Sequence, residues 1–171
     1  MKGNTIASPD QVRSTIRKAI EKLGEGERPL VRTLKQQAVK EFSTRYIREE
    51  LFGIISGNNL SKEEYLSFPR AGRKVVFSAS LRQTFWELYE NFHAILEAQG
   101  LVAHSELAKE AHVLLTGGSA SPSYDYILID EAQDLPVTYL SVLVESCRSP
   151  EGLFLAADMK QSIYSVDSWK R

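Results

Sequence analysis

The 171 residues are 43% hydrophobic and 25% charged with a formal net charge of −1, as expected for a soluble globular protein of one or one and a half domains. The apolar runs are far too short to span a bilayer and the polar start lacks a signal-peptide core, so we expect no membrane partner. The single cysteine, Cys147, excludes an intrachain disulfide and fits a cytoplasmic location.

Residues 1–45 are predicted to form N-terminal helices and are a candidate basic arm. The first helix begins with a capping box formed by Ser8 and Gln11, and it ends at Gly24. A second, longer helix is predicted over residues 32–53, because apolar side chains recur there at helical spacing. The side chains expected to face inward from it are Leu34, Ala38, Phe42, Tyr46 and Ile47.

Residues 46–116 are predicted to form a helical subdomain. Ser61 and Glu64 match a second capping box. A long amphipathic helix is predicted over residues 80–99, followed by a short one over residues 105–115. The long helix carries a stripe of aromatic side chains, which we interpret as core packing rather than as a surface for base stacking.

Residues 117–171 begin with a flexible link and continue as a βαβ unit. The runs 126–129 and 153–156 are too short for helices and lack alternation, which predicts strands covered on both faces. The segment 136–147 between them has helical spacing, and Asp134 is placed to cap that helix. A right-handed crossover makes the strands parallel. The predicted fold class is therefore α/β, with a helical part before a parallel βαβ sheet.

Acidic residues follow both predicted strands. Because the carboxyl ends of parallel strands meet at one edge of the sheet, Asp130 and Asp158 are expected to emerge together there. A carboxylate held by rigid backbone can take Mg²⁺, and Glu131, one residue later, points elsewhere and can orient or deprotonate a water. A single Asp-Glu pair more often only ends a strand, so the surrounding residues decide between the two interpretations.

The surrounding residues resemble two motifs of the UvrD/Rep-like superfamily 1 DNA helicases. Residues 127–135, Ile-Leu-Ile-Asp-Glu-Ala-Gln-Asp-Leu, are similar to motif II, the Walker B box. Residues 158–164, Asp-Met-Lys-Gln-Ser-Ile-Tyr, are similar to motif III, with Ala157 where the family usually has Gly. The resemblance implies a partial RecA-like P-loop NTPase sheet. It also implies ATP and Mg²⁺ as cofactors of the complete enzyme.

The same resemblance assigns roles to individual residues. Asp130 would coordinate Mg²⁺ and Glu131 would activate the hydrolytic water. Gln161 would sense the γ-phosphate and Tyr164 would lie near single-stranded DNA. The usual Arg-aromatic-Arg-Gly run after motif III is replaced here by Ser-Val-Asp-Ser-Trp-Lys, in which Trp169 offers a stacking face.

The helical subdomain extends the resemblance. Residues 46–55, 64–66 and 70–74 are similar to the subdomain that these helicases insert before motif II, as are Arg82 and Trp86. Residues 1–82 carry 16 Lys and Arg against 9 Asp and Glu, whereas residues 83–171 carry 5 against 13. The basic half can be a phosphate-binding surface, or the two halves can simply attract each other. The candidate DNA contacts from the helical subdomain are Arg70, Arg73 and Lys74.

The sequence contains no Gly-x-x-x-x-Gly-Lys-Ser/Thr loop to cradle phosphates, so Walker A is missing. No segment matches the family's second motor domain. Two interpretations stay open. The chain is part of a UvrD-like ATP-dependent DNA helicase that is inactive alone and has DNA, and a separate chain with the P-loop or second motor domain, as partners. Alternatively, it is a non-enzymatic module that binds DNA or a partner.

Overall fold

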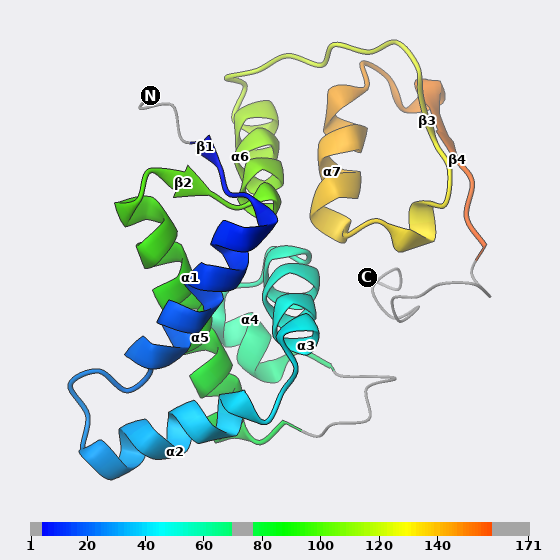
Figure 1. The fold of residues 1–171 in the computed structure, drawn as a ribbon. Helices are drawn as coiled ribbons and strands as arrows, with labels where there is room; N and C mark the ends of the chain where they lie inside the picture. Colours follow the sequence, from blue (N-terminus) through cyan, green and yellow to red (C-terminus); the bar gives the residue numbers. More distant parts are fainter. Residues whose placement is uncertain (1–4, 70–76, 159–171) are drawn as a thin grey trace.

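The computed structural model describes residues 5–69 and 77–158 and shows a mostly helical α/β protein with two small parallel sheets (Figure 1). The helices of this part of the chain are α1 (Pro9–Lys22), α2 (Pro29–Lys40), α3 (Thr44–Arg48), the π-helix η1 (Glu49–Ser56), α4 (Lys62–Ser67), α5 (Ala79–Ala98), α6 (His104–Thr116) and α7 (Val137–Ser146), with 3-10 turns η2 (Ala132–Asp134) and η3 (Pro150–Gly152). The strands are β1 (Thr5–Ile6), β2 (Leu101–Val102), β3 (Ile127–Ile129) and β4 (Leu153–Leu155).

The predicted capping box of Ser8 and Gln11 at the start of α1 is confirmed. The Ser8 hydroxyl accepts from the Gln11 N–H at 3.3 Å, and the Ser8 N–H donates to the Gln11 side chain at 2.8 Å. The buried side chains of α1 include Ile16 and Ala19. Gly24 follows the helix at φ +69°, where a Cβ would lie 2.8 Å from the Arg32 Cα, so the turn into α2 requires glycine here.

The prediction of one helix over residues 32–53 is wrong. The chain breaks after α2, and the Ser43 hydroxyl accepts from the Tyr46 N–H at 3.2 Å, which starts α3 in a new direction. The π-helix η1 follows directly. Because α2 packs through Val39, which is fully buried, Leu34 faces solvent with 57% of its surface exposed instead of facing inward.

Helix α5 is the centre of the helical part (Figure 1). Ser78 caps it by accepting from the Leu81 N–H at 3.2 Å, and the helix matches the predicted 80–99 segment within a residue. Its aromatic side chains are buried in one core with residues of α1, α2, α3, η1 and α4, so the core-packing interpretation is confirmed. Arg82 donates to the carbonyls of Tyr65 and Phe68 at 2.8 and 2.9 Å, which ties α4 to α5.

The sequence gives no sign of the sheet formed by β1 and β2. These strands pair in parallel, with Thr5 opposite Leu101 and Ile6 opposite Val102. The Ala7 N–H extends the ladder by donating to the Val102 carbonyl at 2.9 Å. Two-residue strands are too short for a periodic pattern, which is why the prediction missed them.

The predicted βαβ unit is present. Strands β3 and β4 pair in parallel, with Ile127 opposite Leu153, and α7 forms the crossover. Two details of the prediction are wrong. The strands are not covered on both faces, because α7 lies on one side of the sheet and no other described element lies on the opposite side (Figure 1), so Leu128 is 78% and Phe154 56% exposed. Asp134 does not cap α7; it lies in η2, and the helix begins after Pro136 without a side-chain cap.

Helix α6 joins the two parts by packing against α7. None of the helices in residues 5–69 and 77–158 has the length and apolar character that a membrane crossing requires.

Candidate functional site

The candidate site lies where β3 and β4 end. The Ala156 N–H donates to the Ile129 carbonyl at 2.8 Å, and the Ala132 N–H donates back to the Ala156 carbonyl at 2.9 Å. This continuation of the ladder carries the two chain segments side by side past the strands. Asp130 and Asp158 therefore leave the sheet at the same edge, as the parallel pairing predicted.

Gln133 links the two segments, a role that the sequence alone does not predict. Its side chain is 2% exposed; Nε2 donates to the Glu131 carboxylate, and Oε1 accepts from the Asp158 N–H at 3.0 Å. A buried amide with both ends bonded is rigidly held, because leaving either end unpaired would be costly. The sequence signal was a glutamine within the acidic run Asp-Glu-Ala-Gln-Asp.

Glu131 has a left-handed backbone, with φ 52° and ψ 38°. A non-glycine residue pays about 1–2 kcal/mol for this conformation, and such positions cluster at functional sites. The conformation aims the Glu131 N–H at the Asp130 carboxylate, which accepts it at 2.9 Å. Asp130 and Glu131 are both exposed, so a ligand can reach their carboxylates.

The oxygens at this edge suit Mg²⁺. Residues 5–69 and 77–158 hold no group of three or more His, Cys, Asp or Glu side chains able to enclose a metal ion. Mg²⁺ does not need such a cage, because it is usually held by one or two carboxylates together with waters and substrate phosphates. Asp130 keeps one carboxylate oxygen beyond its bond to the Glu131 N–H, so it fits this mode of binding.

Only part of the predicted site is placed. Asp130 and Glu131 are brought together and joined to Asp158 through Gln133. The other predicted site residues lie outside the described residues: Gln161, Tyr164, Trp169, Arg70, Arg73 and Lys74.

Several basic side chains of the helical part are engaged within the protein. Lys35 donates to Glu27 at 2.8 Å and to Glu87 at 2.7 Å, the second contact joining the basic and acidic halves of the chain. Burial by itself lowers the pKa of Lys35, but the hydrogen bonds to the two carboxylates outweigh it and raise the pKa above its usual value. Arg45 pairs with Glu49 at 2.8 Å.

Other basic side chains remain available for a ligand. Arg17 and Lys40 line a pocket of about 230 Å³ between α1, α2 and α3, together with Glu21 and with Arg13, which is paired with Asp10. Within the described part of the chain, Arg17 and Lys40 make no side-chain hydrogen bond or ion pair. This pocket is therefore one place in the described helical part where a phosphate would meet unpaired cations.

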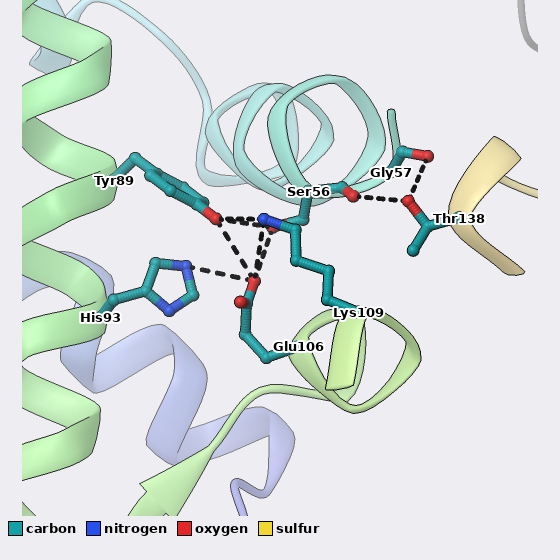
Figure 2. Close-up of polar contacts among 7 residues, drawn as sticks. All are labelled: Ser56, Gly57, Tyr89, His93, Glu106, Lys109 and Thr138. Carbon is teal, nitrogen blue, oxygen red and sulfur yellow. Dashed lines mark hydrogen bonds and ion pairs between the residues drawn. The ribbon is translucent and has the colours of Figure 1, made fainter. Parts of the chain in front are cut away.

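A polar cluster is buried between η1, α5 and α6 (Figure 2). The Glu106 carboxylate accepts from the Ser56 hydroxyl at 2.9 Å and from the Tyr89 hydroxyl at 3.3 Å. The Lys109 ammonium donates to the Tyr89 hydroxyl at 2.9 Å. His93 Nε2 lies 3.5 Å from Glu106 without a hydrogen bond. Burial lowers the pKa of His93, Glu106 opposes that shift, and the nearby Lys109 adds to it.

Comparison with known proteins gives one family. Residues 5–168 match the family described as the UvrD/REP helicase N-terminal domain. No curated protein matches the chain. The family match includes both the helical part and the β3–α7–β4 unit.

Proposed function

The chain belongs to the UvrD/REP helicase family, and from this membership we propose that it is part of a UvrD-like ATP-dependent DNA helicase. The family implies ATP and Mg²⁺ dependence in the complete enzyme and suggests DNA as its partner. The observation that carries the proposal for this chain is the carboxylate edge of the β3–β4 sheet. There a buried glutamine fixes Glu131 relative to the segment that follows β4.

We assign roles to the side chains of this edge. Asp130 would hold Mg²⁺, which when bound neutralises phosphate charge and polarises the phosphoryl group. Gln133 would keep the Glu131 carboxylate in one orientation, and Glu131 would accept a proton from the attacking water. Because Gln133 also bonds the Asp158 N–H, the segment that continues to Gln161 begins from a fixed point. Gln161 would sense the γ-phosphate.

We also propose that β3 and β4 are neighbouring strands of a partial RecA-like sheet. A parallel sheet of this kind is covered on both faces. The exposed face of β3 and β4 carries the apolar side chains Leu128 and Phe154, which supports the proposal because further elements of a complete motor domain would cover them. The 171 residues contain no glycine-rich phosphate loop. The phosphate cradle would therefore come from a segment outside them, on the same polypeptide or on a separate chain that also brings the second motor domain.

We propose that residues 1–45 are N-terminal helices, residues 46–116 a helical subdomain and residues 117–171 a partial motor domain. The single core that runs from Ala7 to Ala103 favours a close union of the first two. We place the protein in the cytoplasm with the DNA on which it acts. There Tyr164, Trp169, Arg70, Arg73 and Lys74 would contact the nucleic acid.

The test is reconstitution with the polypeptide that carries the P-loop. The gene and its neighbours identify that polypeptide, and the two are mixed or joined before ATP turnover is measured with and without DNA. We expect DNA-stimulated turnover that Glu131→Gln abolishes. Glu145→Gln, which changes an exposed acid on α7, is the matched control and should keep full activity. Unchanged turnover in the Glu131 variant would remove that residue from catalysis.

The second candidate is a non-enzymatic module that binds DNA or a partner. The unpaired Arg17 and Lys40 in their pocket favour it, because they can contact phosphate without any catalytic group. DNA binding that persists while every reconstituted mixture lacks ATP turnover would decide for this candidate.

A further inference from the structure

The start of α7 is fastened to the end of the π-helix η1, which lies some eighty residues earlier in the chain (Figure 2). The Thr138 N–H donates to the Gly57 carbonyl at 3.0 Å. The Thr138 hydroxyl lies 2.9 Å from the carbonyls of both Ser56 and Gly57 and shares its proton between them. Thr138 is only 3% exposed, so these bonds form away from water.

The geometry of η1 explains why these carbonyls are available. The last carbonyls of a helix have no partner within it and must find one elsewhere. The Ser56 carbonyl accepts from the Asn59 N–H at 3.0 Å, and its second lone pair accepts from Thr138. Gly57 ends η1 with right-handed helical dihedrals, φ −64° and ψ −25°, and a Cβ there would lie 2.5 Å from the Gly53 carbonyl oxygen and 2.9 Å from that of Phe52. Only glycine fits this approach, and it leaves the Gly57 carbonyl directed at Thr138.

The other side of this contact is equally fixed. Ser56 is fully buried, and its hydroxyl donates to Glu106 of α6 and lies 3.4 Å from the Tyr89 hydroxyl of α5. Lys109 completes the cluster by bonding Tyr89. Thr138 is therefore bonded to the end of η1, whose position is fixed by contacts with α5 and α6.

The chain between Thr138 and the candidate site is short and stiff. The Asp134 N–H donates to the Glu131 carbonyl at 2.9 Å, and the Leu135 N–H donates to the Ala132 carbonyl at 3.2 Å. Pro136 follows with a fixed φ and accepts the first bonds of α7. No flexible stretch separates Thr138 from Glu131, so a shift of one moves the other.

We propose that Thr138 is a positioning residue through which the helical part sets the geometry of the Asp130–Glu131 edge. This inference rests on the proposed function only for the catalytic role of Asp130 and Glu131. The bonds of Thr138 hold the η2 turn, and with it Glu131 and Gln133, at a fixed place relative to α5 and α6. Any movement of the helical part then shifts the carboxylates, because η1 and Thr138 connect the two.

The test measures amide hydrogen exchange on the full chain, without ATP or DNA. Thr138→Val removes the hydroxyl donor and keeps the side-chain shape. We expect the amides of Ala132, Asp134 and Ala156 to exchange about tenfold faster or more, because only the Thr138 N–H bond to Gly57 then joins α7 to the end of η1. Thr138→Ser restores the hydroxyl and should restore the wild-type rates.

The matched control is Thr84→Val. Thr84 is also a buried threonine, 5% exposed, whose hydroxyl donates to a backbone carbonyl, but that carbonyl belongs to Ser80 at the start of α5. We divide the exchange rate of the Ala132 amide by the mean rate of the α5 amides, and we expect this ratio in Thr84→Val to equal that of the wild type. Equal effects of the two valine variants on that ratio would overturn the proposal, as would wild-type exchange in Thr138→Val.

A second variant covers the case in which Thr138→Val fails to fold. Ser56→Ala keeps the backbone carbonyls and removes the bond to Glu106, so it should loosen the same three amides while α5 stays protected. Wild-type protection of those amides in Ser56→Ala would contradict the proposal. Because no ligand is present, these results do not depend on whether the chain hydrolyses ATP or binds DNA.

Discussion

Gln133 accepts a hydrogen bond from the backbone N–H of Asp158 at 3.0 Å, and this bond joins the segments that follow the two parallel strands. The same amide donates to Glu131. The orientation of the Glu131 carboxylate is therefore set by the protein itself, without a ligand. Preorganised groups of this kind are what electrostatic catalysis requires, because no reorganisation is left to do during the reaction.

The carboxylate edge of the β3–β4 sheet should not hydrolyse ATP without a phosphate-binding loop. The glycine-rich loop and its lysine stabilise the transferred phosphate, and aligned carboxylates do not replace them. We expect the purified 171-residue chain to show no DNA-stimulated ATP turnover. Turnover that Glu131→Gln abolishes would contradict this expectation, since that substitution keeps the shape of the side chain and removes the base.

DNA binding by the helical part should be weak, insensitive to sequence and steeply dependent on salt. Arg17→Ala and Lys40→Ala should each lower the slope of log affinity against log salt by about 1 in fluorescence anisotropy. Lys35→Ala is the control, because Lys35 is already paired with two carboxylates and should leave the slope unchanged. Affinity that does not change between low and moderate salt would show that these charges form only a solvated face.

The two parts of the protein should differ in local stability. The β3–β4 sheet has two short strands and one exposed face, whereas α5 has eight buried side chains. We expect the amides of β3 and β4 to exchange at least about tenfold faster than those of residues 85–96, because opening the sheet exposes little apolar surface. Equal, strong protection in both parts would mean that the sheet is completed by another strand.

Stability should fall as the solution is acidified through the titration of His93. Burial lowers the pKa of this imidazole in the folded protein, so below about pH 6.5, its ordinary pKa, the unfolded chain takes up a proton that the folded chain does not. The free energy of unfolding, measured by urea denaturation, should therefore be lower at about pH 5.5 than at about pH 7.5.

His93→Gln should reduce that drop, and His104→Gln, which changes an exposed histidine, is the matched control. Glu106 and Lys109 face His93 in the cluster and are the same residues in both variants. An equal pH dependence in wild type and His93→Gln would assign the effect to other groups.

Two glycines of the π-helix region should respond oppositely to alanine. Gly57→Ala places a Cβ 2.5 Å from the Gly53 carbonyl oxygen, so it should cost about 1–3 kcal/mol of unfolding free energy. Gly53→Ala meets nothing within 4 Å and should stabilise by about 0.5–1 kcal/mol. Thermal or urea unfolding measures both, and a neutral Gly57→Ala would show that the turn relaxes easily.

The sequence predicted those features that local chemistry controls. The capping boxes at Ser8 and Ser61 and the parallel β3–β4 pair were all recognisable, because each depends on residues close in the chain or on a motif. The break at Ser43 was not, since the apolar spacing continues through it. Gln133 and Thr138 were missed because their importance comes from partners 25 and 81 residues away.

The pairing of Thr5 with Leu101 has a topological consequence. It brings the point where the chain enters the helical block next to the point where the chain leaves it. A block whose ends are adjacent can be inserted into a loop of another protein, or rejoined as a circular permutant, without separating its core. Residues 5–103 thus have the connectivity of a unit that can be moved into another protein, with its two ends held together by the pairing of β1 and β2.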